Sequence, residues 1–344
     1  MSAIKDRLVI LDPLYSRALS DPQNPFFGDL IHVQYDSITL FQSSKKKNPI
    51  MQIALVEKPL WREQRSLDLA HFCQSLQNPT NEEPLKGLKI AIDPGHIGGR
   101  YCELEGRLYT QSGAAICEGD MNLEISLILK NLLETEGSSV FLSRYTNEPV
   151  SADSDNFPKN YFKSFIRGEY EKRIVSINDF NPDITILIHL NMGNEPGLYD
   201  GINAFVPGNF YQGELNSEED IINFLELLFS PNIFINIKAA ATVISCMTNE
   251  LDTEPFRLFR FGRPELRKYM FEIPGTHEGI MARNLYMLRK IKSPVFLIEG
   301  PHINYEPNFK KFQDETESHT FILKIAESIA SGLVEFVSSC KVPN

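Results

Sequence analysis

The sequence has few cysteines and no Cys-x-x-Cys pair. Its five cysteines are scattered along the chain: Cys73, Cys102, Cys117, Cys246 and Cys340. An odd and scattered set in a chain of 344 residues argues against a disulfide framework. The same spacing argues against a zinc knuckle built from thiolates.

Long hydrophobic runs are also missing. No apolar run approaches about 18 residues, so the sequence predicts no transmembrane helix. Near the N-terminus, Asp6 lies where a signal peptide is basic, and Asp12-Pro13 interrupts the short apolar run. This pattern does not match a secretory signal peptide, which leaves a cytoplasmic location open.

Basic residues are outnumbered by acidic ones, 34 to 45, and the net charge is −11. A nucleic acid is therefore not expected as a partner, because phosphate binding needs a basic face. Hydrophobic residues make up 42% of the chain, enough to bury a core. The length fits a core of roughly 250 residues with an additional module.

The chain divides into two predicted domains. Residues 1–80 read as a small α+β module, with imperfect strand alternation over 28–41 and 50–56 and an amphipathic helix over 61–76. No catalytic motif is found there. After a linker rich in proline and asparagine, the second domain is expected over residues 86–340.

From Leu88 onward, predicted strands alternate with predicted helices. The strands are expected over 88–92, 139–143, 183–190, 201–207 and 293–300, and the helices over 120–136, 169–180, 221–229, 235–251 and 317–337. This alternation predicts an α/β fold with a mainly parallel, twisted sheet and helices on both faces. Residues 97–116 and 148–166 read as loops. An insertion is expected over about residues 208–234, with an acidic start followed by an apolar helix. We hypothesise that this helix either packs in the core or gates the site.

Three of the predicted strands end in a side chain that can bind metal or transfer a proton. His96 follows the turn Asp93-Pro-Gly after the first strand, and His189 and Glu299 end two later strands. Because the carboxyl ends of parallel strands share one edge of a sheet, these residues are expected to converge. The sequence therefore predicts a candidate metal site at this edge.

A catalytic zinc site needs three protein ligands, an open position for water and a nearby carboxylate. The missing ligand is expected on the first loop or at the start of the first helix, where Glu118 lies. A glutamate at a helix start is also favoured by the helix dipole alone, so a structural role stays open. Glu103 and Glu105 on the same loop are rival carboxylate ligands.

Several short motifs, in the same order, resemble those of the zinc-dependent N-acetylmuramoyl-L-alanine amidases of amidase_3 type. The motifs are Asp93-Pro-Gly-His96, Glu118-Gly-Asp-Met-Asn-Leu123, Phe141-Leu-Ser-Arg144, Arg173 with Ile188-His-Leu-Asn191, and Val295-Phe-Leu-Ile-Glu299. Residues 279–289 and 325–330 are similar as well. The resemblance extends from about Lys86 to Val337, and the ordered combination makes it specific.

The resemblance implies an amidase_3-like fold, of the phosphorylase/hydrolase-like kind, with one Zn²⁺ per chain. It implies that His96, Glu118 and His189 hold the zinc and that Glu299 is the catalytic carboxylate. The implied reaction is hydrolysis of the amide between the lactyl group of N-acetylmuramic acid and L-alanine in peptidoglycan. Glu299 would accept a proton from water and deliver it to the departing amine.

Four further residues have roles that the sequence leaves open. Arg144 and Arg173 match family positions and are expected either to contact substrate or to form structural ion pairs. His302 follows the last strand, where the family has a different motif, and either stabilises the oxyanion, binds substrate or packs. Asp93 either orients His96 or caps the turn.

The resemblance also implies peptidoglycan and its muropeptides as partners, a periplasmic or cell-envelope location, and room for a protein activator. Two other functions compete with the amidase. A zinc peptidase of carboxypeptidase type would need a His-x-x-Glu pair, but Gly99 lies three residues after His96. A non-catalytic cell-wall binding protein is disfavoured because all four site residues are intact.

Overall fold

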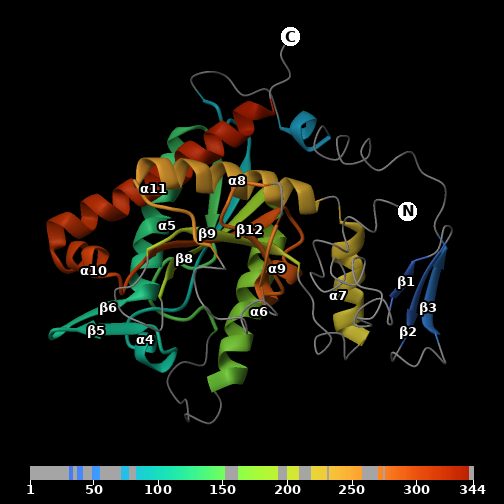
Figure 1. The fold of residues 1–344 in the computed structure, drawn as a ribbon, viewed down its shortest axis with the longest axis horizontal. Coiled ribbons are helices and arrows are strands. Elements are labelled where there is room, and N and C mark those ends of the chain that lie inside the picture. The colour runs from blue at the N-terminus through green and yellow to red at the C-terminus, as the bar shows by residue number, and fades with distance from the viewer. Residues whose placement is uncertain are drawn as a thin grey trace.

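The computed structural model describes most of the chain (Figure 1). The described residues are 31–33, 37–41, 49–54, 71–76, 83–151, 162–192, 200–208, 218–230, 232–257, 270–273 and 276–340. Within these ranges, no helix is both long and apolar enough to cross a membrane.

A small antiparallel sheet lies in the described part of the N-terminal region. It contains β1 (Ile31–Val33), β2 (Ser37–Phe41) and β3 (Pro49–Ala54), in that order. These strands fall where the sequence predicted them. Of the helix predicted over 61–76, residues 71–75 are helical, and residues 61–70 lie outside the described part of the chain.

Among the described residues, the central sheet has seven strands in the order β10-β11-β9-β12-β8-β4-β7. In chain order these are β4 (Lys89–Pro94), β7 (Ser139–Leu142), β8 (Ile184–Asn191), β9 (Asn203–Pro207), β10 (Met270–Glu272), β11 (Ile280–Arg283) and β12 (Val295–His302). Strands β7, β4, β8 and β12 run parallel to one another. Strand β9 pairs with β12 in the opposite direction. The sheet is therefore mostly parallel, as predicted.

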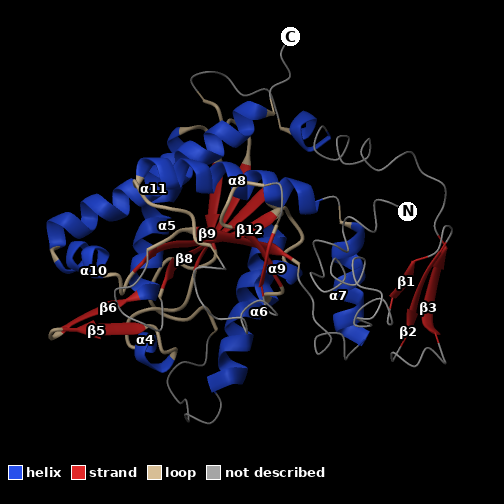
Figure 2. Ribbon diagram, viewed as in Figure 1, coloured by secondary structure: helices blue, strands red, loops and turns tan. Residues whose placement is uncertain are grey.

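Helices cover both faces of this sheet (Figures 1 and 2). Helices α5 (Glu118–Thr135), α8 (Asn232–Glu250) and α11 (Glu315–Ser339) share one apolar core with the even-numbered strand residues, such as Ile92 and Ile186. Helices α6 (Phe162–Phe180) and α9 (Tyr286–Lys290) share the other with odd-numbered residues such as Leu187. Burial of both faces explains why the strands read as continuous apolar runs.

Two segments predicted as loops contain regular structure. Residues 97–116 include helix α4 (Tyr101–Leu104) and the antiparallel hairpin of β5 (Leu108–Gln111) and β6 (Ala114–Cys117). Helix α6 begins at Phe162, inside the loop predicted over 148–166. Helix α4 and strands β5 and β6 are short, and helix α6 is weakly amphipathic. Apolar periodicity therefore did not reveal them. A short helix, α10 (Glu306–Gln313), precedes α11.

The expectation of no disulfide framework is wrong. Cys73 pairs with Cys340, 267 residues away, and Cys102 pairs with Cys117. Cys246 is the free cysteine. The first disulfide joins the helical segment at residues 71–75 to the end of α11, and the second closes the α4–β5–β6 segment. Both pairings depend on tertiary placement, which cysteine spacing does not encode.

Candidate active site

The turn after β4 places His96 at the carboxyl edge of the sheet. The backbone of Gly95 donates to the carbonyl of Ile188 on the neighbouring strand at 2.8 Å. A Cβ atom on Gly95 would lie 2.4 Å from the imidazole of His189, so the close approach of that ring requires glycine. His96 itself has φ +58°, a conformation that non-glycine residues rarely adopt. The surrounding structure must therefore hold this turn.

Arg144 is one of the side chains that hold the turn. Its guanidinium donates to the carbonyls of Pro94 (2.9 Å) and Gly95 (3.0 Å), and to the carbonyl of Gly119 at the start of α5 (2.7 Å). Its Nη1 atom donates to the carbonyl of Thr146. Arg144 is buried, and its donors are engaged inside the protein, which does not favour the expected contact with substrate.

Arg173 on α6 holds the same turn as well. It donates to the carbonyls of Pro94 and His96, each at 2.9 Å. It also forms ion pairs with Glu169 (2.9 Å) and Asp93 (3.5 Å). Because this side chain is fully buried, it does not offer a surface to substrate either. Asp93 faces Arg173 and Ser143, so the structure gives no support to its predicted role as the orienting partner of His96.

Glu118 lies in the first turn of α5 and faces both histidines. Its Oε1 atom is 3.2 Å from Nε2 of His96 and 3.2 Å from Nδ1 of His189. The side chain is 1% exposed, and the amide of Asn122, one helical turn further along, lies 3.4 Å from Oε1. The three residues predicted as ligands from distant parts of the sequence therefore meet at one place.

The charges in this group are strongly coupled. Burial opposes the charge on His96, but the Glu118 carboxylate and a contact with Glu105 outweigh burial and raise the pKa of His96 to about 9. Burial also opposes the charge on Glu118, yet the two imidazoles hold the pKa of this carboxyl well below its usual range. Burial lowers the pKa of His189. The group is thus a buried carboxylate in contact with two imidazoles.

Glu299 lies beside this group on the adjacent strand. It is the register partner of His189 in the pairing of β12 with β8, and of Asn203 in the pairing with β9. Burial and the nearby charge of Glu118 raise the pKa of Glu299 to about 8. A carboxyl group with a pKa near neutrality can accept a proton and return it, as a general base and acid must.

The three ligand candidates fit zinc. Their donor atoms all lie within 4.8 Å of one another. Ligand atoms about 2.0–2.2 Å from a tetrahedral zinc are about 3.3–3.6 Å apart, close to the two measured distances of 3.2 Å. The second oxygen of Glu118 is buried without a hydrogen bond, and the guanidinium of Arg107 lies 3.6 Å from it, so the fit to zinc rests on the first oxygen and the two imidazoles. Two imidazoles and one carboxylate are a donor set found in catalytic zinc sites.

The remaining candidates lie around this group in other roles. His302 is buried, stacks on Phe256 at 6.3 Å, and places its Nδ1 atom 3.6 Å from Asp200. The rival ligand Glu103 is exposed on α4. The second rival, Glu105, contacts the outer side of the His96 ring.

Two residues near the group had no role assigned from the sequence. Asn122 contacts Glu118 and also donates to the carbonyl of Gly95 at 3.3 Å, and the helical spacing of four residues from Glu118 is the signal that could have revealed it. Arg107, from the α4–β5–β6 segment, places its guanidinium 3.6 Å from the second oxygen of Glu118. No sequence pattern pointed to Arg107.

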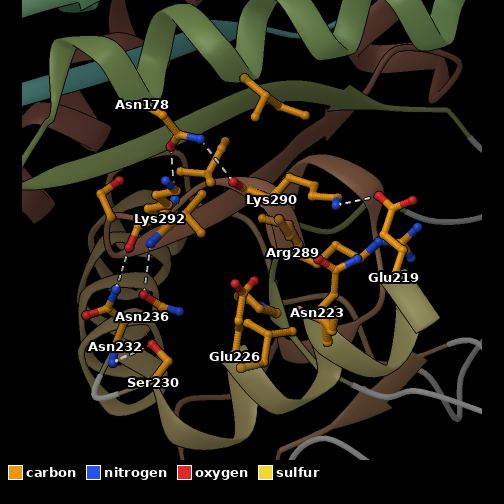
Figure 3. A pocket seen from close by; sticks show the side chains of 18 residues that line it. Asn178, Glu219, Asn223, Glu226, Ser230, Asn232, Asn236, Arg289, Lys290 and Lys292 are labelled. Atoms are coloured by element: carbon orange, nitrogen blue, oxygen red, sulfur yellow. Dashed lines mark hydrogen bonds and ion pairs between the residues drawn. The ribbon is translucent and has the colours of Figure 1, made fainter. Parts of the chain in front are cut away.

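A separate cavity of about 710 Å³ lies beside α7 (Glu218–Phe229), and it is lined in part by α9 and the start of β12 (Figure 3). An ion pair of 2.6 Å between Lys290 and Glu219 crosses it. Pro207, the last residue of β9, lines the cavity, and because β9 is antiparallel to β12 this residue lies at the edge opposite Glu299. The described part of the insertion at about 208–234 is therefore remote from the metal group, which does not favour the gating hypothesis.

The architecture is supported by the solved structure of an amidase. The CwlD amidase from Clostridioides difficile, solved in complex with the GerS lipoprotein, has 19% sequence identity and a TM-score of 0.51, covering 74% of this chain and 100% of that chain. The amidase AmiC2 of Nostoc punctiforme has 16% identity and a TM-score of 0.47, covering 74% and 99%. No curated protein matches the chain.

The sequence model of one family extends over most of the α/β domain. It is the model described as "Amidase_3: N-acetylmuramoyl-L-alanine amidase", and it matches residues 90–333. The match includes all four residues of the site, His96, Glu118, His189 and Glu299. Since it spans more than half of the chain, this protein belongs to the Amidase_3 family of amidases, which are cell-wall hydrolases.

Proposed function

We propose that this protein is a zinc-dependent amidase that cleaves peptidoglycan between the lactyl group of N-acetylmuramic acid and L-alanine. The observation that carries the proposal is the buried group of His96, Glu118 and His189, with Glu299 on the next strand, within the region that matches the family. In this proposal the first three residues hold one Zn²⁺ per chain.

Glu299 has the properties of the proton carrier. It would take the proton of the attacking water and then donate it to the amino group of L-alanine, which leaves with its peptide. Its raised pKa, near 8 as described above, suits both halves of this transfer. A bound zinc ion would polarise the amide carbonyl and lower the pKa of water towards about 7.

The cell wall as the site of action has independent support. Two disulfides persist best in an oxidising compartment outside the cytoplasm, and this chain has two. One structural neighbour was solved with a lipoprotein bound. We extend this to a proposal that this chain also binds a protein partner, which acts as its activator.

Digestion of purified muropeptides tests the proposal. The expected products are peptides with a free L-alanine amino group and glycan that keeps its lactyl group, identified by mass. A chelator should abolish their release and added zinc should restore it. Cleavage within the peptide would instead indicate a zinc peptidase, and binding without cleavage would indicate a cell-wall binding protein. Either result would refute the proposed reaction.

A further inference from the structure

A buried carboxylate that no function above uses lies against the outer side of His96. Glu105 follows α4, and its side chain is 4% exposed. One oxygen accepts a hydrogen bond of 2.9 Å from the backbone of Ile97. The other oxygen lies 3.7 Å from Nδ1 of His96. A charged group buried to this degree needs a partner, and His96 is the nearest candidate.

The orientation of the His96 ring defines what this carboxylate faces. Nε2 of His96 points to Glu118, at 3.2 Å. Nδ1 therefore points away from the metal group, and it is buried without a hydrogen bond in the structure. An imidazole that binds a metal through one nitrogen carries a proton on the other, and that N–H requires an acceptor. In the described part of the chain, the carboxylate that contacts this nitrogen is that of Glu105, at 3.7 Å.

Two other acidic residues close to His96 in the sequence are engaged elsewhere or exposed. Asp93 binds Ser143 and Arg173. Glu103 is exposed on α4. Glu105 does not belong to the group of mutually close ligand atoms, because it lies on the Nδ1 side of the ring. These positions separate Glu105 from the candidate metal ligands and leave it as the carboxylate that faces Nδ1, at 3.7 Å.

We infer that Glu105 is a positioning residue, which fixes the tautomer and the orientation of His96 so that Nε2 can bind the metal. The inference rests on the proposed function. Hydrogen-bonded carboxylates behind metal-binding imidazoles typically change metal affinity by about 10–100-fold.

The segment that delivers Glu105 is built to hold it there. The Cys102–Cys117 disulfide closes the segment, and the backbone of Arg107 donates to the carbonyl of Cys102 at 2.7 Å. The backbone of Glu118 in turn donates to the carbonyl of Arg107 at 3.1 Å. One closed segment thus supports two ligands of the group, and this gives the long loop of residues 97–116 a function in the metal site.

The test uses the full chain and measures the Zn²⁺ dissociation constant by competition with a chelator. Glu105→Gln keeps the shape of the side chain but has one acceptor oxygen instead of two. If that oxygen accepts from Ile97, the amide NH₂ faces the N–H of His96, where donor opposes donor. We expect Glu105→Gln to weaken zinc binding by about 10-fold or more. Glu103→Gln, the matched exposed variant, should bind zinc like the wild type.

Thermal unfolding of the metal-free variants separates positioning from folding. Glu105→Gln is expected to unfold within a few degrees of the wild type, so that the loss is specific to zinc. Should Glu105→Gln bind zinc as tightly as the wild type, the inference is overturned. An equal loss of zinc affinity in Glu103→Gln would also overturn it. A wild-type protein without zinc affinity would instead refute the proposed function itself.

Discussion

Replacement of Glu299 by glutamine is expected to lower kcat by about 10²–10⁴-fold, the usual contribution of proton transfer by a positioned side chain. Glutamine has the same shape but cannot accept and return a proton. Zinc binding should be retained, since Glu299 lies outside the group of close ligand atoms. The measurement is the rate of muropeptide cleavage, together with the zinc content of the purified variant.

Glu306→Gln serves as the control for this prediction. Glu306 is exposed at the start of α10 and pairs with Lys310 at 2.8 Å, an interaction that contributes little to stability. Its removal should leave kcat unchanged. If Glu299→Gln kept most of its activity, another residue would have to transfer the proton, and the assignment of the base would be wrong.

Replacement of Arg173 by methionine is expected to lower the free energy of unfolding by about 3–5 kcal/mol, the cost of breaking a buried ion pair from one side. Asp93 and Glu169 would keep buried negative charges without their partner. The carbonyls of Pro94 and His96 would also lose a donor, and the strained turn would lose one of its supports. Denaturant unfolding of the two proteins measures the difference.

The same helix provides a matched control. Arg167 lies on α6, is exposed and pairs with Glu171 at 3.0 Å. Arg167→Met should therefore change the free energy of unfolding by less than about 1 kcal/mol. Equal small losses in both variants would show that the guanidinium of Arg173 does not hold the turn.

The sequence was sufficient to predict five of the seven strands described in the central sheet, and to place the candidate ligands at one edge; strands β10 and β11 were not predicted. Strands that end in His96, His189 and Glu299 read as buried apolar runs, and parallel strands share one edge, so convergence followed from topology. Glu118 could be predicted at the same edge because the helix that follows the first strand begins there. These inferences worked because they depend on local pattern and on the direction of the strands.

Contacts between distant side chains could not be predicted in the same way. Arg144 and Arg173 matched the family pattern, yet only the structure shows that both donate to carbonyls of the turn before His96. The partner of Cys73 is 267 residues away. Glu105 and Arg107 reach the site from a segment whose helix and strands span only four residues each, too few for periodicity to register.

Zinc titration of the metal-free protein by calorimetry tests the central claim most directly. We expect uptake of about one equivalent per chain, strong loss of affinity in His189→Ala, and unchanged uptake in His319→Ala, where an exposed histidine on α11 is removed. Uptake should strengthen as the pH rises towards about 9, since the proton on His96 must leave first. Absence of zinc uptake, or equal uptake in His189→Ala, would contradict the account.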